Sequence, residues 1–186
     1  MSPANRSPEK PGPRVKRLAE MLRVDHAGEY GAVAIYRGQR AVFSSLPHKE
    51  AVAKKIEEME AGEAEHLKIF DHLLMERGVR PTLLAPLWSA AGFGLGAATA
   101  LMGEKAAMAC TEAVEDVIEK HYWEQADALD ADEPGLAATI RQFREDEIGH
   151  KQTAEAAGAA DAPGYGLLSR AIRFGCRAAI RVAEKI

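Results

Sequence analysis

Two short motifs in this chain place a carboxylate and an imidazole three residues apart, a spacing that puts both side chains on one face of a helix. They are Glu63 with His66 and Glu147 with His150. Apolar residues recur at helical spacing on both sides of each motif, so each pair lies on the line that should face the core. A carboxylate is costly to bury unless it is paired or binds a metal. The two motifs therefore indicate a buried polar site.

Each motif is preceded by another glutamate on the apolar face of an earlier expected helix, Glu29 in one case and Glu115 in the other. One such glutamate and one Glu-x-x-His per helix pair is the ligand pattern of carboxylate-bridged di-iron and di-manganese bundles. Four ionised glutamates balance two divalent cations, and mixed oxygen and imidazole ligands suit iron or manganese. The sequence therefore predicts a dinuclear metal site with the ligands Glu29, Glu63, His66, Glu115, Glu147 and His150.

Glu112 and Glu119 are alternatives to Glu115 as a ligand, because both lie close to it in the sequence. Glu115 fits the apolar line best and also matches the spacing of the repeat. His26, His121 and Tyr122 are further candidates, as groups that support the metal ligands from outside. The two histidines could instead simply be packed in the core, and the sequence leaves this open.

The elements that must position these residues are helices. With 186 residues, 47% of them apolar, and few aromatics, the chain is expected to form a single all-α domain over 14–186. Four long helices are expected over 14–43, 48–77, 103–129 and 134–157. Residues 1–13, with four prolines, are expected to be a disordered tail. Ser45 and Asp132 are expected to cap the second and fourth of these helices.

Residues 82–103 contain no charged side chain. Three interpretations compete: a buried crossover between helix pairs, a segment that dips into a membrane face, and a true membrane span. The last helix, 164–186, is amphipathic and carries recurring cations, which indicates either a membrane-surface helix or a bundle helix with a solvated basic face. Glycines beside Glu29 suggest a closely approaching neighbour, unless they are merely tolerated. Two cysteines far apart, Cys110 and Cys176, suggest a reducing compartment.

Several motifs resemble those of the demethoxyubiquinone hydroxylases, the di-iron enzymes of late ubiquinone biosynthesis. The opening motif is Arg23-Val24-Asp25-His26-Ala27-Gly28-Glu29-Tyr30-Gly31-Ala32, and the segment from Ala107 to Glu115 contains a second. Glu63-x-x-His66-Leu67, His121-Tyr122, Phe143-Arg144 with Glu147-x-x-His150, and the closing 175–180 segment also fit. The resemblance covers 14–186. The first two motifs are specific, whereas Glu-x-x-His is common to ferritin-like di-iron proteins.

The resemblance implies a ferritin-like four-helix bundle with a long apolar crossover between its second and third helices and an additional C-terminal amphipathic helix. It also implies two iron ions, bridged by Glu63 and Glu147, with Glu29 and Glu115 more terminal. The implied reaction is hydroxylation of the ring of a prenylated demethoxyubiquinone, using O₂ and electrons from NADH. No dinucleotide fingerprint is present, because the glycines at 92, 94 and 96 follow no expected strand.

Members of that family sit on a membrane face, and some work with a lipid-binding accessory protein of the same pathway. The expected location is therefore the cytoplasmic side of a bacterial inner membrane, as a peripheral protein, since no transit-type leader is visible. The isoprenoid chain length, the oligomeric state, including a homo-oligomer, and the immediate electron donor stay open. So does the depth to which 82–103 enters lipid.

Three other functions remain as alternatives. A bacterioferritin-like protein for iron oxidation and storage has the same ligand repeat. A di-iron hydroxylase could act on another substrate such as a modified tRNA base, but no strong basic surface beyond the last helix favours a nucleic-acid partner. A non-catalytic lipid carrier requires that the metal site be empty.

Overall fold

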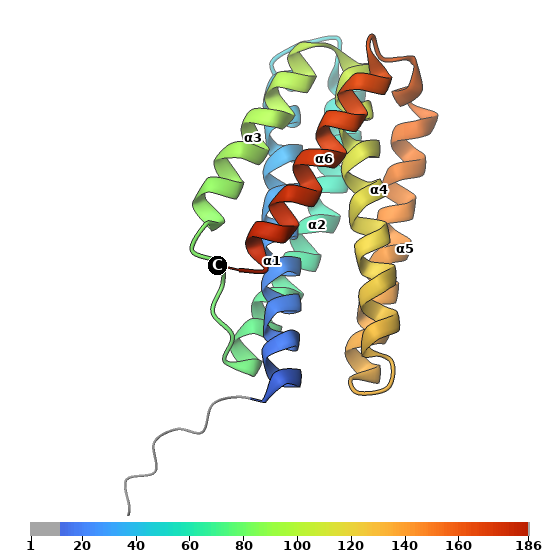
Figure 1. Ribbon diagram of the computed structural model, residues 1–186. Helices are drawn as coiled ribbons and strands as arrows, with labels where there is room; N and C mark the ends of the chain where they lie inside the picture. The colour runs from blue at the N-terminus through green and yellow to red at the C-terminus, as the bar shows by residue number, and fades with distance from the viewer. Residues whose placement is uncertain (1–11, 186) are drawn as a thin grey trace, which may run out of the picture.

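The structure is a computed structural model that describes residues 12–185. Six α-helices account for most of this range, and no strand occurs within it (Figure 1). The expected all-α fold is confirmed. The helices are α1 (Pro13–Phe43), α2 (Glu50–Arg77), α3 (Ala85–Leu101), α4 (Glu104–Leu129), α5 (Pro134–Ala156) and α6 (Tyr165–Ala183), with a short 3₁₀ helix at Ala159–Asp161. The expected tail lies, apart from its last two residues, outside the described residues.

Four of the helices, α1, α2, α4 and α5, form a ferritin-like bundle in which α1 packs on α2 and α4 packs on α5. Apolar side chains fill the bundle in two separate clusters. One contains Tyr36, Ile56 and Met108, and the other contains Leu22 and Phe70 with parts of α4 and α5. Along each of the four helices, the glutamate that interrupts the apolar face lies between a residue of one cluster and a residue of the other.

The expected helix caps are wrong at two starts. The backbone continues from α1 as turns through Leu46, and Ser45 Oγ donates a hydrogen bond back to Val42 O, so α2 begins only at Glu50. Asp132 accepts a hydrogen bond from Arg14 at 3.0 Å instead of capping α5. In both places the expected capping side chain makes another hydrogen bond, to the preceding helix for Ser45 and to a distant helix for Asp132. Such bonds compete with capping. The expected end of α2 at Gly78 is confirmed, with φ of 61°.

The uncharged segment forms the loop and helix α3, which packs along α1 as a crossover between the two helix pairs. The two backbones approach very closely. A Cβ atom added at Gly92 would lie 2.7 Å from Gly31 O, and one at Gly38 or Gly96 would fall on the backbone of the opposite helix. The expected close neighbour is therefore α3, which approaches the Gly31 carbonyl and the Cα side of Gly38, whereas a Cβ atom added at Gly28 or Gly31 would meet none of the described atoms within 4 Å. Within the described range, no helix is both long and apolar enough to cross a membrane.

Helix α6 lies against α4 and reaches α1, on the same side of the bundle as α3 (Figure 1). Ion pairs join it to α4: the Arg173 guanidinium contacts Glu112 at 2.6 Å and Asp116 at 3.0 Å. Glu112, which the sequence left as an alternative ligand, therefore belongs to this interhelical pairing. Helices α3 and α6 thus form a second layer over α1 and α4.

Candidate metal centre

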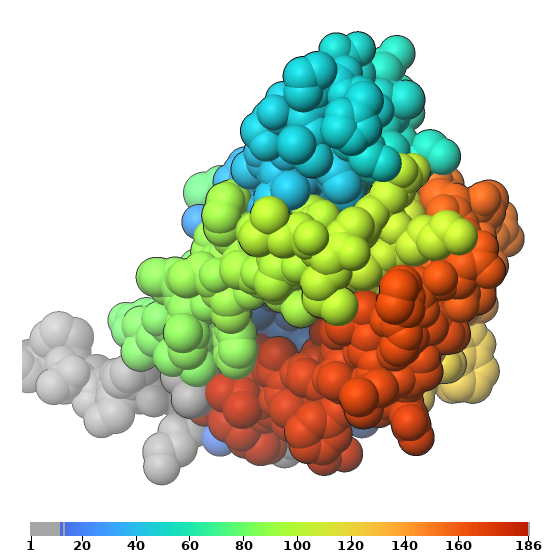
Figure 2. All heavy atoms as spheres, turned by 90° about the horizontal axis from the view of Figure 1, so that it is seen from above, coloured from blue at the N-terminus to red at the C-terminus, as the bar shows by residue number. Residues whose placement is uncertain are grey.

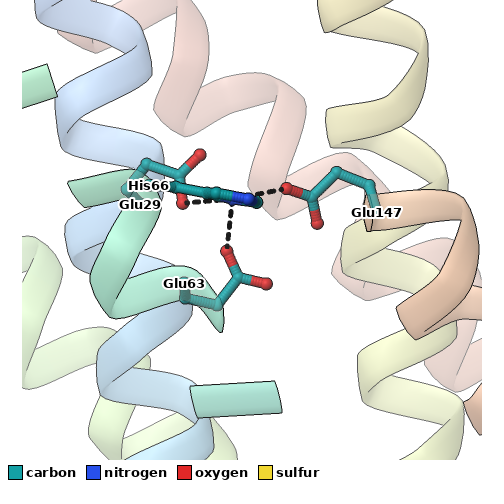
Figure 3. Close-up of side chains that lie close together, drawn as sticks. All are labelled: Glu29, Glu63, His66 and Glu147. Carbon is teal, nitrogen blue, oxygen red and sulfur yellow. Dashed lines mark ion pairs between the residues drawn. The ribbon is translucent and has the colours of Figure 1, made fainter. Parts of the chain in front are cut away.

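The six side chains singled out in the sequence meet inside the bundle. They form two groups of four, and within each group the nitrogen or oxygen atoms lie within 4.8 Å of one another. One group is Glu29, Glu63, His66 and Glu147 (Figure 3), and the other is Glu63, Glu115, Glu147 and His150. Glu63 and Glu147 belong to both groups. Two adjoining positions that share two carboxylates are the arrangement of a carboxylate-bridged pair of metal ions.

Each imidazole directs its Nδ1 atom at the shared carboxylates. His66 Nδ1 lies 3.3 Å from Glu147, 3.6 Å from Glu63 and 3.7 Å from Glu29 (Figure 3). His150 Nδ1 lies 2.8 Å from Glu63 and 3.6 Å from Glu147. Helical spacing explains this, because each Glu-x-x-His pair comes from one helix face and the faces of α2 and α5 point at each other.

The inward-facing atoms are buried and lack hydrogen-bond partners among the described residues. Both carboxylate oxygens of Glu63 and of Glu147 are in this state, as are one oxygen each of Glu29 and Glu115 and the Nδ1 atoms of both histidines. Buried polar groups are rarely left unpaired, because desolvation then goes uncompensated. A set of eight such atoms pointing at two common positions fits the ligands of two divalent metal ions. The assignment of the six residues as ligands stays a prediction.

Four buried carboxylates lie so close together that their charges perturb pKa values within the cluster. Burial, and then repulsion from Glu63, raises the pKa of Glu29 well above its ordinary value. Burial and the charge of Glu147 do the same to the pKa of Glu115. Burial would also raise the pKa of Glu63, but the imidazoles of His150 and His66 lower it to about 2. Without cations, some of these glutamates must therefore hold protons, which metal ions would displace.

Two tyrosines hold the outer glutamates in a reciprocal arrangement. Tyr36 of α1 donates a hydrogen bond to Glu115 of α4, and Tyr122 of α4 donates one to Glu29 of α1. Each tyrosine stands seven residues after the glutamate of its own helix. The two halves of the site are therefore related by an approximate twofold symmetry. Each hydrogen bond fixes one carboxylate oxygen and leaves the other free for a ligand role.

The structure places the other sequence candidates around the site. Tyr122 contacts Glu29 directly. His26 Nε2 lies 2.9 Å from Asp71 and His121 Nε2 lies 3.1 Å from Asp25, so neither histidine belongs to the two groups of four. Sequence reasoning missed three neighbouring groups as functional residues: Tyr36, Asp25 and Asp146. The signal for Tyr36 was its position on the same apolar line as Glu29.

Loading the protein with a divalent transition metal is expected to raise its melting temperature. A ligand that binds only the folded state at 100 times its Kd contributes about 2.7 kcal/mol per site, which for a chain of this size corresponds to about 5–10 °C for each site filled. Calorimetry of the metal-free protein with and without Co²⁺ measures this. Mg²⁺, which prefers oxygen ligands and keeps its waters, should give a much smaller shift. An unchanged melting temperature with Co²⁺ would contradict a preformed metal site.

An apolar cavity of about 490 Å³ lies between α1, α3, α4 and α6, and none of the six candidate ligands is among its lining residues. Its wall on α1 includes Gly28 and Ala32, which flank Glu29, and its wall on α4 includes Val114, next to Glu115. Figure 2 shows a hollow between α3 and α6, with α1 visible at the bottom. The glycines beside Glu29 thus border open space. The cavity can hold an apolar molecule against α1 and α4, the two helices that carry Glu29 and Glu115.

Comparison with known proteins identifies the family. A family model described as "Ubiquinone biosynthesis protein COQ7" matches residues 16–183. The 3-demethoxyubiquinol 3-hydroxylase of Rhodospirillum rubrum is 49% identical over 182 residues, which are 98% of this chain and 84% of the relative. The NADPH-dependent 3-demethoxyubiquinone 3-hydroxylase, mitochondrial, of Mus musculus is 47% identical over 169 residues, 89% of this chain and 76% of that relative.

A third relative, the 5-demethoxyubiquinone hydroxylase, mitochondrial, of Saccharomyces cerevisiae, is 41% identical over 185 residues, 91% of this chain and 78% of that relative. The name of the mouse relative specifies NADPH, whereas the resemblance seen in the sequence implied NADH. The expected resemblance and the expectation of a hydroxylase enzyme are confirmed by the family match and by these names. The chain therefore belongs to the COQ7 family of ubiquinone biosynthesis proteins, and these three relatives are named as hydroxylases.

Proposed function

We propose that this protein is a di-iron monooxygenase that hydroxylates the ring of a prenylated demethoxyubiquinone-type substrate, using O₂ and electrons from NADH or NADPH. The observation that carries the proposal is the pair of four-residue groups sharing Glu63 and Glu147. Two ferrous ions bound there would supply the electrons and the open coordination positions that the reduction of O₂ requires. The names of the relatives support the choice of substrate.

The protein's side chains would bind the substrate, orient the metal ligands and exclude water from the site. The cavity walls are almost wholly apolar, which suits an isoprenoid tail and its attached ring. Tyr36 and Tyr122 hold Glu115 and Glu29 in fixed orientations. The packed side chains around Phe70 and Phe143 close the cluster from the other end of the bundle. These packed apolar side chains would exclude water from the bound metal ions and from the substrate.

The test is the mass of the quinone after turnover. Iron-loaded protein is mixed with a short-chain demethoxyubiquinol or demethoxyubiquinone, a reductant and ¹⁸O₂, and the products are weighed. We expect the gain of one oxygen atom carrying the label. An unchanged quinone, together with oxidation of far more than two ferrous ions per chain, would contradict the proposal and indicate the iron-storage function instead.

Filling the cavity should block this reaction without affecting the metal ligands. Ala179 lines the cavity, whereas the neighbouring Ala178 is exposed and does not. We expect Ala179→Phe to lower kcat/KM for hydroxylation by at least about 10-fold, the size of effect that a lost or blocked apolar contact produces. The Ala178→Phe variant should match the unmodified protein. Iron content should be equal in all three, and equal kinetics would show that the substrate binds elsewhere.

We further propose that the face around the hollow rests on a membrane surface, from which the substrate enters. Exposed apolar side chains lie next in sequence to cavity-lining residues on both helices: Leu87 and Phe93 of α3 adjoin Trp88 and Gly92, and Phe174 of α6 adjoins Gly175. Arginines of α6 accompany them, which suits anionic headgroups. We expect co-sedimentation with vesicles of phosphatidylglycerol that weakens for Phe93→Ser/Phe174→Ser. Unchanged binding by that double variant would place the contact on another face.

A further inference from the structure

The approximate symmetry of the metal site is broken at the outer side of the two histidines. Asp146 directly precedes Glu147, and its carboxylate lies 3.1 Å from His66 Nε2. The corresponding residue before Glu63 is Gly62, and a Cβ atom added there would lie 3.3 Å from His150 Nε2. Gly62 thus faces His150 as Asp146 faces His66, but it carries no side chain. Among the described residues, no group accepts a hydrogen bond from His150 Nε2.

The aromatic contacts of the two imidazole rings also differ, and again His66 is held more firmly than His150. His66 stacks on Phe143 with ring centroids 4.1 Å apart and an interplanar angle of 26°. His150 meets only the edge of Tyr36, with centroids 6.2 Å apart and an angle of 75°. His66 is therefore held by a carboxylate on one atom and by an aromatic face along its ring. His150 has neither contact, and its side chain is also more exposed, at 15% against 6%.

A carboxylate on the outer nitrogen of a metal-binding histidine fixes its tautomer and ring orientation and increases its basicity. At His66 the Asp146 carboxylate accepts a hydrogen bond from Nε2–H. The lone pair is then on Nδ1, which faces Glu147 and Glu63. At His150 nothing comparable selects Nδ1 as the free nitrogen. The hydrogen bond is partly exposed, since the Asp146 side chain is 45% accessible, but its orienting effect on the buried ring does not require burial.

We propose that the two metal positions are inequivalent: the position formed with His66 binds its metal ion first and more tightly, because Asp146 orients that histidine and Gly62 leaves His150 without the same support. The proposal rests on the proposed two-metal site and adds an order of filling to it. Asp146 is here a positioning residue, acting through His66. The more weakly held ion at the His150 position would be the first to be lost or exchanged.

The test is anaerobic titration of metal-free protein with Co²⁺, followed by calorimetry and by visible absorption of the bound ion. We expect two binding steps of unequal affinity. To separate the positions, Glu115→Gln leaves only the His66 position intact, and Glu29→Gln leaves only the His150 position. Adding Asp146→Ala should weaken binding by about 10- to 100-fold in the Glu115→Gln protein and change little in the Glu29→Gln protein. Asp146→Asn, which keeps an accepting oxygen, should fall between.

The matched control is Glu145→Ala, which removes the adjacent exposed carboxylate of the same helix and should leave both affinities unchanged. Equal affinities of the two positions, or an equal effect of Asp146→Ala in both backgrounds, would overturn the inequivalence while leaving the two-metal site standing. Binding of no Co²⁺ by the unmodified protein would overturn both. Melting temperatures of the metal-free variants show whether each protein is folded before it is titrated.

Discussion

Replacing Glu63 by alanine is expected to remove both metal ions, whereas replacing Glu115 is expected to remove one. Glu63 contributes to both groups of four, and Glu115 contributes only to the group that contains His150. Iron bound per chain after anaerobic loading and desalting should fall from two to well below one in Glu63→Ala and to about one in Glu115→Ala. Because loss of an outer supporting group alone costs about 10- to 100-fold in affinity or activity, hydroxylation should fall by more than 100-fold in both variants.

The control for this comparison is Glu65→Ala. Glu65 lies two residues after Glu63 on the same helix, but its side chain is 67% exposed, and within residues 12–185 its ion pair is with Lys68. That variant should keep two irons and full activity. If Glu63→Ala and Glu115→Ala retained the same number of irons, Glu63 would not bridge two positions, and the division of the cluster into two sites would be wrong.

The close approach of α3 to α1 should make one glycine of α3 irreplaceable. A Cβ atom at Gly96 would fall on the backbone carbonyl of Ile35, so Gly96→Ala must push the two helices apart. Overpacking of this kind costs about 1–3 kcal/mol. The free energy of unfolding, measured by urea denaturation and circular dichroism, should therefore decrease by about that amount.

Gly94 provides the opposite case on the same helix. It is exposed, and a Cβ atom there would meet no atom within 4 Å. Gly94→Ala should increase the free energy of unfolding by up to about 1 kcal/mol, through helix propensity alone. A stabilising effect of Gly96→Ala would mean that α3 does not lie against α1 as described. Because α3 also lines the cavity, Gly96→Ala should impair substrate binding more than metal binding.

The helices and the meeting of six side chains could be predicted because both depend on local periodicity. A Glu-x-x-His pair on the apolar face of a helix points toward the core, whichever helix lies opposite. When four helices each carry a polar residue on the apolar face, these residues meet at the centre of the bundle. Glu115 could be chosen over Glu112 for the same reason. The apolar line of α4 favours Glu115 as the inward-facing residue, and the structure agrees, since Glu112 pairs with Arg173 of α6.

Contacts between helices far apart in the sequence could not be predicted in this way. The hydrogen bonds from Tyr36 to Glu115 and from Tyr122 to Glu29 depend on the relative height of α1 and α4. No local pattern records that height. The expected caps failed for a related reason, since Asp132 is drawn to Arg14 across the fold. The role of Gly62 became visible only once His150 was seen beside it.

The most direct test of the two-metal site is anomalous diffraction at the iron absorption edge from crystals of the iron-loaded protein. We expect two peaks of similar height inside the bundle, both beside Glu63 and Glu147, one also beside Glu29 and His66 and the other beside Glu115 and His150. A single peak, or peaks only at surface carboxylates, would contradict the account. The buried glutamates would then have to be explained by protonation rather than by metal binding.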